Sequence, residues 1–185
     1  MGWTADFALD AMGMLERGRK RVDGNEGTVN IIGDGGHATV VRDLLIGRHF
    51  TESYAIIAIG DNAARKREAE SLQGYLFASL AHPTAWISPS ASIGAGIVVM
   101  AGVVVQAHAR IGKHVILNTG CTVDHDCIIG DYAHIAPGAH LCGGVEVGEG
   151  SLIGVSVGIP PGCKIPAWSL VKARRLEIVP LQNHC

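Results

Sequence analysis

One short segment of the sequence places a histidine between two carboxylates, because Asp124, His125 and Asp126 are consecutive. Histidine titrates near neutral pH, so a neutral imidazole can take a proton from a reacting amine or hydroxyl as a general base. A neighbouring carboxylate can hold one ring nitrogen protonated and leave the other free to accept. We therefore predict that His125 is a catalytic base, oriented by Asp126 or Asp124. The alternative interpretation is a solvated surface histidine.

A second candidate site lies where a β-rich run over 28–32 is followed by glycines and a histidine, namely Gly33, Gly35, Gly36 and His37. A glycine-rich turn that leads into a helix exposes backbone N–H groups to a phosphate or another anion. With Ala38 the turn formally matches the dinucleotide pattern G-x-G-x-x-A, but Glu52, the nearest acid at the required spacing, precedes the second strand instead of ending it. We predict contact with a nucleotide-sugar phosphate or base, with a structural turn as the alternative.

The histidine segment must be positioned by a repeat that runs through the C-terminal half of the chain. From Ile87 to Val171 every sixth residue is Ile, Val or Leu, at fifteen consecutive positions. Four residues after each lies a second restricted position, which is mostly small, as at Ala91, Cys121 and Ser169. An α-helix cannot carry a period of six, and one flat strand cannot run so far. The period predicts a parallel β-solenoid whose branched aliphatic side chains point inward.

This period resembles the hexapeptide repeat of the left-handed parallel β-helix family, whose coils are triangular prisms of three hexads. The resemblance implies eighteen residues per coil and about five coils. On that spacing, His125 stacks on Gly143 in the next coil and on Ala107 in the preceding one, about 4.8 Å away. A glycine there leaves a pocket at the imidazole, in which the Gly143 N–H can donate to a developing oxyanion.

Other histidines of the repeat could contact a substrate or bind a metal ion. On the same spacing His134 stacks between Ile116 and Leu152, an apolar setting for a ligand-facing or a structural histidine. His125, His134 and His140 are nine and six residues apart. This spacing does not match the three-histidine zinc site of carbonic anhydrases, so we expect no metal.

The rest of the chain is predicted to form an α/β unit and two terminal segments. A β-α-β-α-β order favours a small, truncated, Rossmann-like parallel sheet, with elements expected at 28–32, 38–46, 54–59, 63–73 and 75–80. The predicted segments are an N-terminal extension at 1–26, a nucleotide-binding α/β domain at 27–84, the β-helix at 85–173 and a C-terminal tail at 174–185. For the N-terminal extension we consider an amphipathic helix.

Composition excludes several classes of function. Hydrophobic residues make up 48% of the 185 residues but aromatic residues only 5%, so the core must be aliphatic. The net charge of −2 argues against nucleic-acid binding through bulk electrostatics. No stretch approaches the roughly 20 apolar residues of a membrane span, and the N-terminus lacks the features of a secretory signal. The odd number of cysteines, five, fits a reducing compartment, so we expect a cytoplasmic protein without membrane insertion.

Beyond its fold, the sequence resembles the bacterial nucleotide-sugar N-acetyltransferases of the sialic-acid O-acetyltransferase group. This group includes the enzymes that acetylate UDP-4-amino sugars on the way to bacillosamine, and the GDP-perosamine N-acetyltransferases. The resemblance covers roughly residues 28 to 171. It rests on the segments 31–37, 57–62 with Arg65, and 117–139.

The resemblance implies a homotrimeric N-acetyltransferase that uses acetyl-CoA, with active sites between neighbouring β-helices. By the same resemblance His125 deprotonates the C4 amine of the sugar, Asp126 supports the imidazole and Gly143 donates to the oxyanion. His134 and Asn118 help to position the two substrates. The implied nucleotide contacts are Gly33, Gly35, Gly36, His37, Asp61, Asn62 and Arg65, and the implied CoA contacts are His134, Gly143, Gly154 and Val155.

Two alternatives stay open at this point. The first is an O-acetyltransferase of a sialic-acid-like sugar, which would use the same base on a hydroxyl. The second is a non-catalytic trimeric β-helix scaffold. The chain departs from the family pattern over 48–53, and after Val171, where the family normally adds a closing segment. The identity of the nucleotide, UDP or GDP, therefore stays open.

Overall fold

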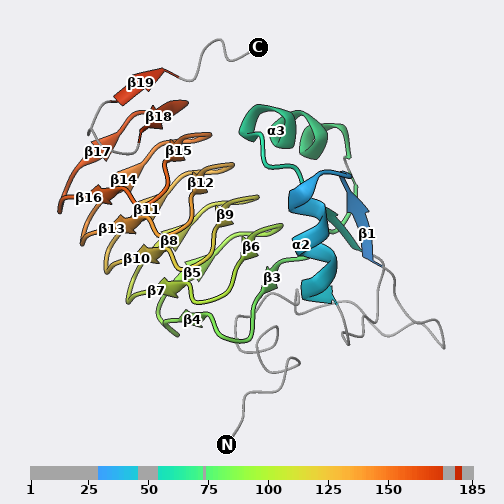
Figure 1. Ribbon diagram of the computed structural model, residues 1–185, viewed down its shortest axis with the longest axis horizontal. Coiled ribbons are helices and arrows are strands. Elements are labelled where there is room, and N and C mark those ends of the chain that lie inside the picture. The colour runs from blue at the N-terminus through green and yellow to red at the C-terminus, as the bar shows by residue number, and fades with distance from the viewer. Residues whose placement is uncertain (1–28, 46–53, 73, 173–177, 181–185) are drawn as a thin grey trace, which may run out of the picture.

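The computed structural model describes residues 29–45, 54–72, 74–172 and 178–180. It shows a parallel β-solenoid of about five coils with a small α/β unit beside it (Figure 1), so both predicted parts of the fold are confirmed. The helix predicted within 1–26, the acid Glu52 and most of the tail at 174–185 lie outside the described residues.

Each coil adds one short strand to each of three sheets. The first sheet contains β4 (Trp86–Ile87), β7 (Val104–Val105), β10 (Thr122–Val123), β13 (His140–Leu141) and β16 (Gly158–Ile159). The second contains β5 (Ser92–Ile93), β8 (Arg110–Ile111), β11 (Ile128–Ile129), β14 (Glu146–Val147) and β17 (Lys164–Ile165). The third contains β3 (Leu80–Ala81), β6 (Val98–Val99), β9 (Ile116–Leu117), β12 (His134–Ile135), β15 (Leu152–Ile153), β18 (Ser169–Val171) and β19 (Ile178–Pro180).

The strand register confirms the coil length of eighteen residues. Thr122 pairs with Val104 in the preceding coil and with His140 in the following one. The chain runs from the third sheet to the first, then to the second, and back to the third. The turns between these strands form three edges of the prism, which we call the third–first, first–second and second–third edges.

The α/β unit is smaller than the sequence predicts. Its sheet has two parallel strands, β1 (Val29–Ile32) and β2 (Tyr54–Ile57), with helices α2 (Gly36–Leu45) and α3 (Asn62–Ser71). The third strand expected at 75–80 is reduced to a single bridge between Ala55 and Phe77. The reason is that Leu80 already donates its N–H to Ile97 of the solenoid, so the chain leaves the small sheet after one bridge and enters the third sheet.

The end of the chain also differs from expectation. Strand β19 lies within the predicted tail and pairs antiparallel with β18, so that Leu170 lies opposite Val179. It thereby covers the last open edge of the third sheet, a position at which unpaired backbone groups otherwise invite association.

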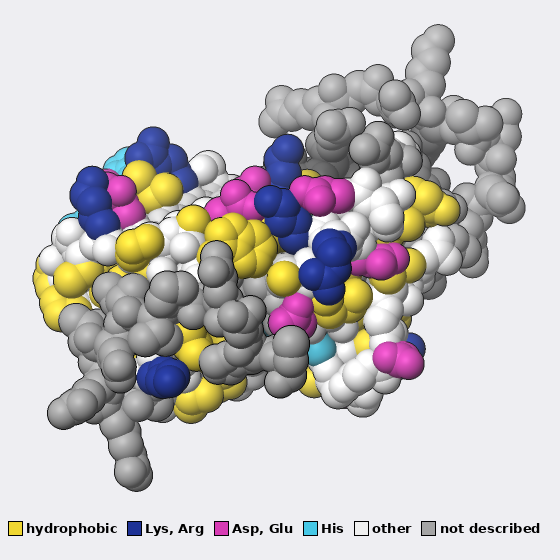
Figure 2. Space-filling view, turned by 90° about the horizontal axis from the view of Figure 1, so that it is seen from above, with side chains coloured by type: hydrophobic (Ala, Val, Ile, Leu, Met, Phe, Trp, Pro, Cys, Tyr) yellow, Lys and Arg dark blue, Asp and Glu magenta, His cyan; other side chains and the backbone are white. Residues whose placement is uncertain are grey.

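The distribution of charged side chains on the described surface agrees with the small net charge of the chain, −2. On the face that Figure 2 shows, basic and acidic side chains lie side by side instead of forming one extended basic area. Lys164 and Glu146, for example, form an ion pair at 2.8 Å across neighbouring strands of the second sheet. Within the described residues, no helix is long and apolar enough to cross a membrane.

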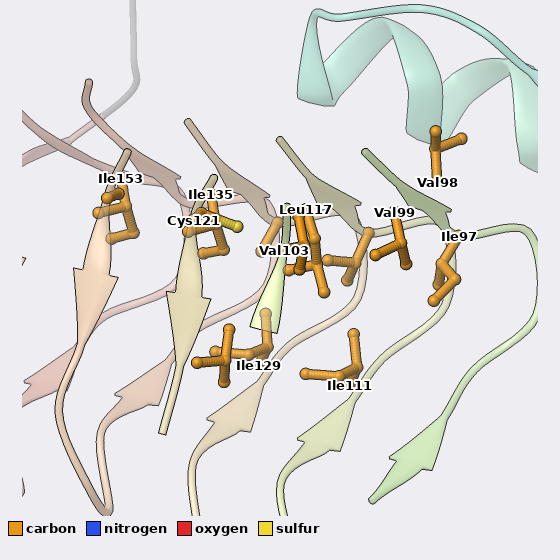
Figure 3. Close-up of a cluster of buried hydrophobic side chains, with 14 of the residues drawn as sticks. Ile97, Val98, Val99, Val103, Ile111, Leu117, Cys121, Ile129, Ile135 and Ile153 are labelled. Atoms are coloured by element: carbon orange, nitrogen blue, oxygen red, sulfur yellow. The ribbon is translucent and has the colours of Figure 1, made fainter. Parts of the chain in front are cut away.

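The core of the solenoid consists of the aliphatic side chains of the six-residue repeat (Figure 3). From Val99 to Val171 every member of the series is buried, whereas Ile87 and Ile93 at the N-terminal end are only partly buried. The second restricted position also points inward, and Cys121 and Ala133 there are fully buried. Small residues fit at this position because the chain turns a corner inside a close-packed prism.

Truncation of a core side chain is expected to destabilise the protein strongly. Ile135 is fully buried and lies between Leu117 and Ile153 of the adjacent coils. Ile135→Ala should lower the free energy of unfolding by about 2–5 kcal/mol, because it removes buried methyl groups and leaves a cavity. Urea unfolding at fixed protein concentration measures this loss. Val155→Ala, at a residue that is 54% exposed, is the control, and equal effects of the two substitutions would contradict the assigned core.

Candidate active site

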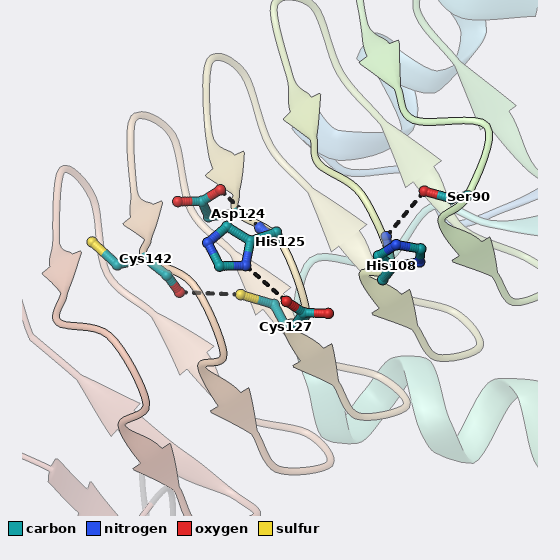
Figure 4. Close-up of polar contacts among 7 residues, drawn as sticks. Ser90, His108, Asp124, His125, Cys127 and Cys142 are labelled. Atoms are coloured by element: carbon teal, nitrogen blue, oxygen red, sulfur yellow. Dashed lines mark hydrogen bonds and ion pairs between the residues drawn. The ribbon is translucent and has the colours of Figure 1, made fainter.

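His125 lies on the first–second edge, directly after strand β10 (Figure 4). A carboxylate oxygen of Asp124 accepts the backbone N–H of His125 at 2.8 Å. The imidazole Nδ1 lies 2.8 Å from Oδ2 of Asp126. Asp126 is thus the carboxylate that orients the ring, while Asp124 caps the turn. With Nδ1–H donated to Asp126, the free lone pair of the imidazole is on Nε2.

Gly143 of the next coil lies against the imidazole. A Cβ atom at this position would be 2.6 Å from Nε2 and Cε1 of His125, so only glycine leaves room for the ring. The adjacent Gly144 N–H donates to the His125 carbonyl at 2.9 Å, which holds the two coils in register. In the described part of the chain, the Gly143 N–H has no hydrogen-bond partner. It is therefore free to donate to an incoming oxygen.

The environment of His125 favours its protonated form. The hydrogen bond that the His125 Nδ1–H donates to Asp126, followed by the charge of Asp124, raises the pKa of His125 above its usual value of 6.5. The side chain is 61% exposed, so a substrate can reach it from solvent. A base with a pKa close to neutral combines a useful neutral fraction with a strong affinity for the proton.

The acid limb of the pH–rate profile is expected to depend on Asp126. Only neutral His125 can accept a proton, so activity should fall as the pH decreases through the raised pKa. Asp126→Asn removes the largest cause of that rise, so the limb should move to lower pH, while the plateau rate falls because the imidazolium loses its partner. Measured kcat/KM against pH tests this. Asp131→Asn, which changes a carboxylate that caps Lys113 on another edge, should leave the limb in place.

Two buried thiols, Cys127 on this edge and Cys121 on the third–first edge, are not nucleophiles. Cys127 is buried below the turn, and its Sγ–H donates to the Cys142 carbonyl at 3.2 Å (Figure 4). Burial raises the pKa of Cys127 and raises that of Cys121 to about 12. Both thiols are therefore protonated at neutral pH and unreactive. Cys121 and Cys127 both lie at the second, mostly small position of the six-residue repeat, where both are buried.

His134 and Asn118 lie together, but on another part of the prism. His134 is on β12 of the third sheet, and its Nε2 lies 3.1 Å from the Asn118 side-chain nitrogen. Burial, followed by the charges of Arg65 and His37, lowers the pKa of His134 to about 4, so this ring is neutral at pH 7. Within one chain, Asn118 lies on the third–first edge and His125 on the first–second edge, so that strand β10 of the first sheet lies between them.

The residues at the start of α3 have partners within the chain itself. Asp61 is the N-cap of the helix, and its side chain accepts the Ala64 N–H at 2.7 Å. Asn62 and Arg65 are buried, and Arg65 is only 1% exposed. Burial lowers the pKa of Arg65 to about 10, which still leaves it charged at neutral pH. All five guanidinium N–H groups of Arg65 are used within the chain, so none is left for a phosphate.

The glycine turn has the geometry of an anion site. Gly33 has a φ of 123°, and a Cβ there would be 2.9 Å from the Ala58 carbonyl. Gly36 begins α2, and within the described residues the N–H groups of Gly36 and His37 have no hydrogen-bond partner. The His37 Nε2 is buried without a partner as well, and burial lowers the pKa of this ring. These unpaired donors lie at a helix N-terminus, where an anion is stabilised.

The predicted CoA contacts Gly154 and Val155 lie on the third–first edge, after strand β15. Val155 is 54% exposed, which suits an apolar contact with a partner molecule. Among the residues that the structure describes, no group of three or more His, Cys, Asp or Glu side chains could hold a metal ion.

Comparison with known proteins agrees with this architecture. Residues 108–143 and 126–161 match the family model described as bacterial transferase hexapeptide (six repeats). PerB from Caulobacter crescentus, crystallised with CoA and GDP-perosamine, is 34% identical; the match covers 81% of this chain and 89% of that chain, with a TM-score of 0.74. The acetyltransferase domain of PglB from Neisseria gonorrhoeae is 32% identical over 80% of this chain and 89% of that chain, with a TM-score of 0.73. No curated protein sequence matches the chain.

The same PglB domain in complex with acetyl-CoA is matched over 85% of this chain and 100% of that chain, at 32% identity and a TM-score of 0.72. These matches define the class of protein: the chain is a bacterial hexapeptide-repeat acyltransferase. Within that class it belongs to the family of nucleotide-sugar N-acetyltransferases that contains PerB and the PglB domain. The resemblance found in the sequence is thereby confirmed.

Sequence reasoning missed the contacts between α3 and the solenoid. Arg65 and Asn62 were expected to contact a nucleotide, but their partners are backbone carbonyls of the second–third edge. The histidine His114, which was not singled out, is buried there between the rings of Phe77 and Tyr132. The available signal is that the residues on an eighteen-residue step at this edge, from position 96 to position 168, are all glycine or carry an aromatic ring.

Proposed function

We propose that this protein transfers the acetyl group of acetyl-CoA to the 4-amino group of a nucleotide-linked amino sugar, with His125 as the general base. The observation that carries the proposal is the imidazole of His125, which is held through Nδ1 by Asp126 and packs against Gly143, a residue whose N–H has no partner within the described residues. A base and an oxyanion donor side by side are what acyl transfer requires. The complexes of PerB with CoA and GDP-perosamine, and of the PglB domain with acetyl-CoA, support this choice of substrates.

The transfer proceeds by direct attack. Nε2 of His125 takes a proton from the sugar amine as its nitrogen attacks the thioester carbonyl carbon, and the C–N bond forms. The carbonyl oxygen gains negative charge and accepts the Gly143 N–H. When the C–S bond breaks, the proton held on the imidazole goes to the leaving CoA sulfur. No covalent intermediate on the enzyme is needed, which agrees with the raised pKa of the nearby Cys127 thiol.

We further propose that the complete site lies between two copies of the chain in a homotrimer. The pair formed by Asn118 and His134 and the pair formed by His125 and Asp126 lie at opposite ends of one side of the prism. A bound substrate contacts both pairs if the third–first edge of one copy faces the first–second edge of another. Gly154 and Val155, on the third–first edge, then line the CoA side of the same site. Sedimentation equilibrium measures the number of copies.

In this proposal the nucleotide binds at the turn formed by Gly33, Gly35, Gly36 and His37, beside Asp61. The unpaired N–H groups of Gly36 and His37 are donors for a phosphate. A cytoplasmic location agrees with these substrates, because both acetyl-CoA and nucleotide sugars are made there.

The proposed reaction is tested by following release of free CoA thiol. The enzyme is mixed with acetyl-CoA and either UDP-linked or GDP-linked 4-amino sugars, and the product is identified by mass spectrometry. N-acetylation of one nucleotide-linked amine supports the proposal. Preferential acetylation of a sialic-acid hydroxyl contradicts it and favours an O-acetyltransferase. Absence of acetyl-CoA binding at millimolar donor in calorimetry also contradicts it, and favours a scaffold.

The nucleotide itself is identified by a thermal-shift panel of UDP, GDP and CDP. A nucleotide that binds the folded state alone raises the melting temperature by mass action. We expect one of the three to give a clearly larger shift than the other two. Equal and negligible shifts for all three would contradict nucleotide binding at the glycine turn.

A further inference from the structure

In the described part of the solenoid, the second–third edge has a column of backbone carbonyls that take no part in backbone hydrogen bonds between coils. One residue per coil has a left-handed backbone there, and these residues are Gly96, His114, Tyr132, Gly150 and Trp168, with φ between 53° and 70°. Within the described residues, the carbonyls of His114, Tyr132 and Gly150 accept no backbone N–H. We call these three groups the carbonyl column. Buried carbonyls without partners are costly, so a donor from elsewhere is expected.

The first turn of α3 supplies the donors. Arg65 donates from Nε to His114 O at 2.9 Å and from Nη2 to Tyr132 O at 2.6 Å. Asn62 donates from its side-chain nitrogen to Gly150 O at 2.9 Å, and its side-chain oxygen accepts from Arg65 at 2.8 Å. Two residues one helical turn apart thus bind carbonyls of three successive coils.

The same guanidinium also binds the α/β unit. Its Nη1 donates to Ile59 O at 2.9 Å and to Gly60 O at 3.2 Å. These carbonyls follow strand β2, at the end of the small sheet that carries the glycine turn, where the Ala58 N–H donates to Ile32 O at 2.7 Å. One buried side chain therefore holds both the proposed nucleotide turn and the solenoid.

A second contact, at the next residue of α3, has the same effect. The Lys66 ammonium lies 2.6 Å from the Glu149 carboxylate. It lies 5.8 Å from the centre of the Tyr132 ring and 5.5 Å from that of Trp168. Tyr132 and Trp168 are two coils apart, and the intervening coil has Gly150 at the same position, which leaves room for a cation between the rings.

We propose that Arg65, with Asn62, is a positioning residue that sets the placement of the nucleotide turn relative to the solenoid, and so delivers the nucleotide-linked amine to the catalytic edge. This inference rests on the proposed function. It differs from the sequence prediction for these two residues, because their polar groups bind the carbonyl column, each other and the carbonyls of Ile59 and Gly60. A small misplacement of a reacting group can cost about a hundredfold in rate, so rigid docking of the α/β unit matters for turnover.

The test compares two acceptors in the variant Arg65→Lys. Lysine keeps the charge but lacks the planar fork that reaches five acceptors. We expect kcat/KM for the nucleotide-linked amino sugar to fall by about ten- to a hundredfold. Activity toward the free 4-amino sugar, which does not use the nucleotide turn, should change by less than about twofold. Arg67→Lys, at an exposed position of the same helix, is the matched control and should resemble the unchanged protein.

Equal losses with both acceptors in a folded Arg65→Lys protein would overturn the proposal, and so would unchanged activity with both. If Arg65→Lys does not fold, Asn62→Ser decides the question by the same comparison of acceptors, because it removes the Gly150 contact.

Hydrogen exchange gives a readout that does not depend on activity. In the Arg65→Lys or Asn62→Ser protein, amides of β1, β2 and α3 should exchange faster, while those of β9, β12 and β15 should keep their protection. Unchanged exchange in the α/β unit would overturn the docking function of these residues. If the unchanged enzyme acetylates no nucleotide-linked amine, the proposed function fails, but the exchange experiment still reports on docking.

Discussion

Replacement of His125 by alanine should reduce kcat by roughly 10²–10⁴-fold, the usual contribution of a positioned general base. An amine that binds as an ammonium ion has no lone pair for attack, so the reaction depends on a group that removes its proton. The imidazole of His125 packs against Gly143, and with Nδ1–H donated to Asp126 its free lone pair is on Nε2. The rate of CoA release under saturating donor and acceptor measures the effect.

The control for this substitution is His108→Ala. His108 lies on the same first–second edge, one coil before Asp126, and is exposed. Its removal should leave kcat within about twofold. Because the His125 side chain is itself 61% exposed, His125→Ala should also leave the melting temperature nearly unchanged, since exposed substitutions rarely alter stability. Full activity of His125→Ala would remove the proposed mechanism, and partial rescue by added imidazole would strengthen it.

The second large effect is expected from a single added methyl group, in Gly143→Ala. The new Cβ would be 2.6 Å from the imidazole of His125, well inside van der Waals contact, so the ring must rotate away and lose its bond to Asp126. The substitution also places a methyl group next to the oxyanion donor. Loss of one such donor typically costs about 10²–10³-fold in kcat, and misplacement of the base adds to this loss.

Gly158→Ala is the matched control for Gly143→Ala. Gly158 lies in β16, which pairs with β13, the strand that precedes Gly143. A Cβ at position 158 would meet nothing within 4 Å. The control should keep its activity, and both variants should still bind acetyl-CoA in calorimetry if the chief effect is on the chemical step. A Gly143→Ala enzyme with unchanged kcat would show that this glycine is not part of the catalytic site.

The solenoid could be predicted from the sequence because its period is local and repeats many times. Each Ile, Val or Leu of the series from Ile87 to Val171 indicates one more inward-facing strand position. The strand register then follows from the coil length. The pair formed by His125 and Gly143 could be predicted once the resemblance to the left-handed β-helix family supplied a coil length of eighteen residues, which places the two residues in adjacent coils. The residues alone left Asp124 and Asp126 open and the family resemblance favoured Asp126; the structure adds the contacts, with Asp126 on the imidazole Nδ1 and Asp124 on the backbone N–H of His125.

The contacts of α3 could not be predicted, because they depend on how two different units dock. The solenoid partners of Arg65 and Asn62 are 49 to 89 residues away and are backbone carbonyls, which have no sequence signature of their own. In the sequence, Asp61-Asn62 followed by Arg65 has the appearance of a polar ligand site. Strand β19 escaped prediction as well, because three residues without a repeat give no periodicity to detect.

The eighteen-residue step also limits how this gene can change its length. A deletion of one residue inside a coil must be absorbed within that coil, where it displaces inward-facing side chains, and between positions 125 and 143 it breaks the contact of His125 with Gly143. Loss or duplication of a whole coil after Gly143 preserves that frame and the catalytic pair with it. Natural relatives and engineered versions are therefore expected to differ in length by multiples of eighteen within the prism, with other insertions confined to its turns.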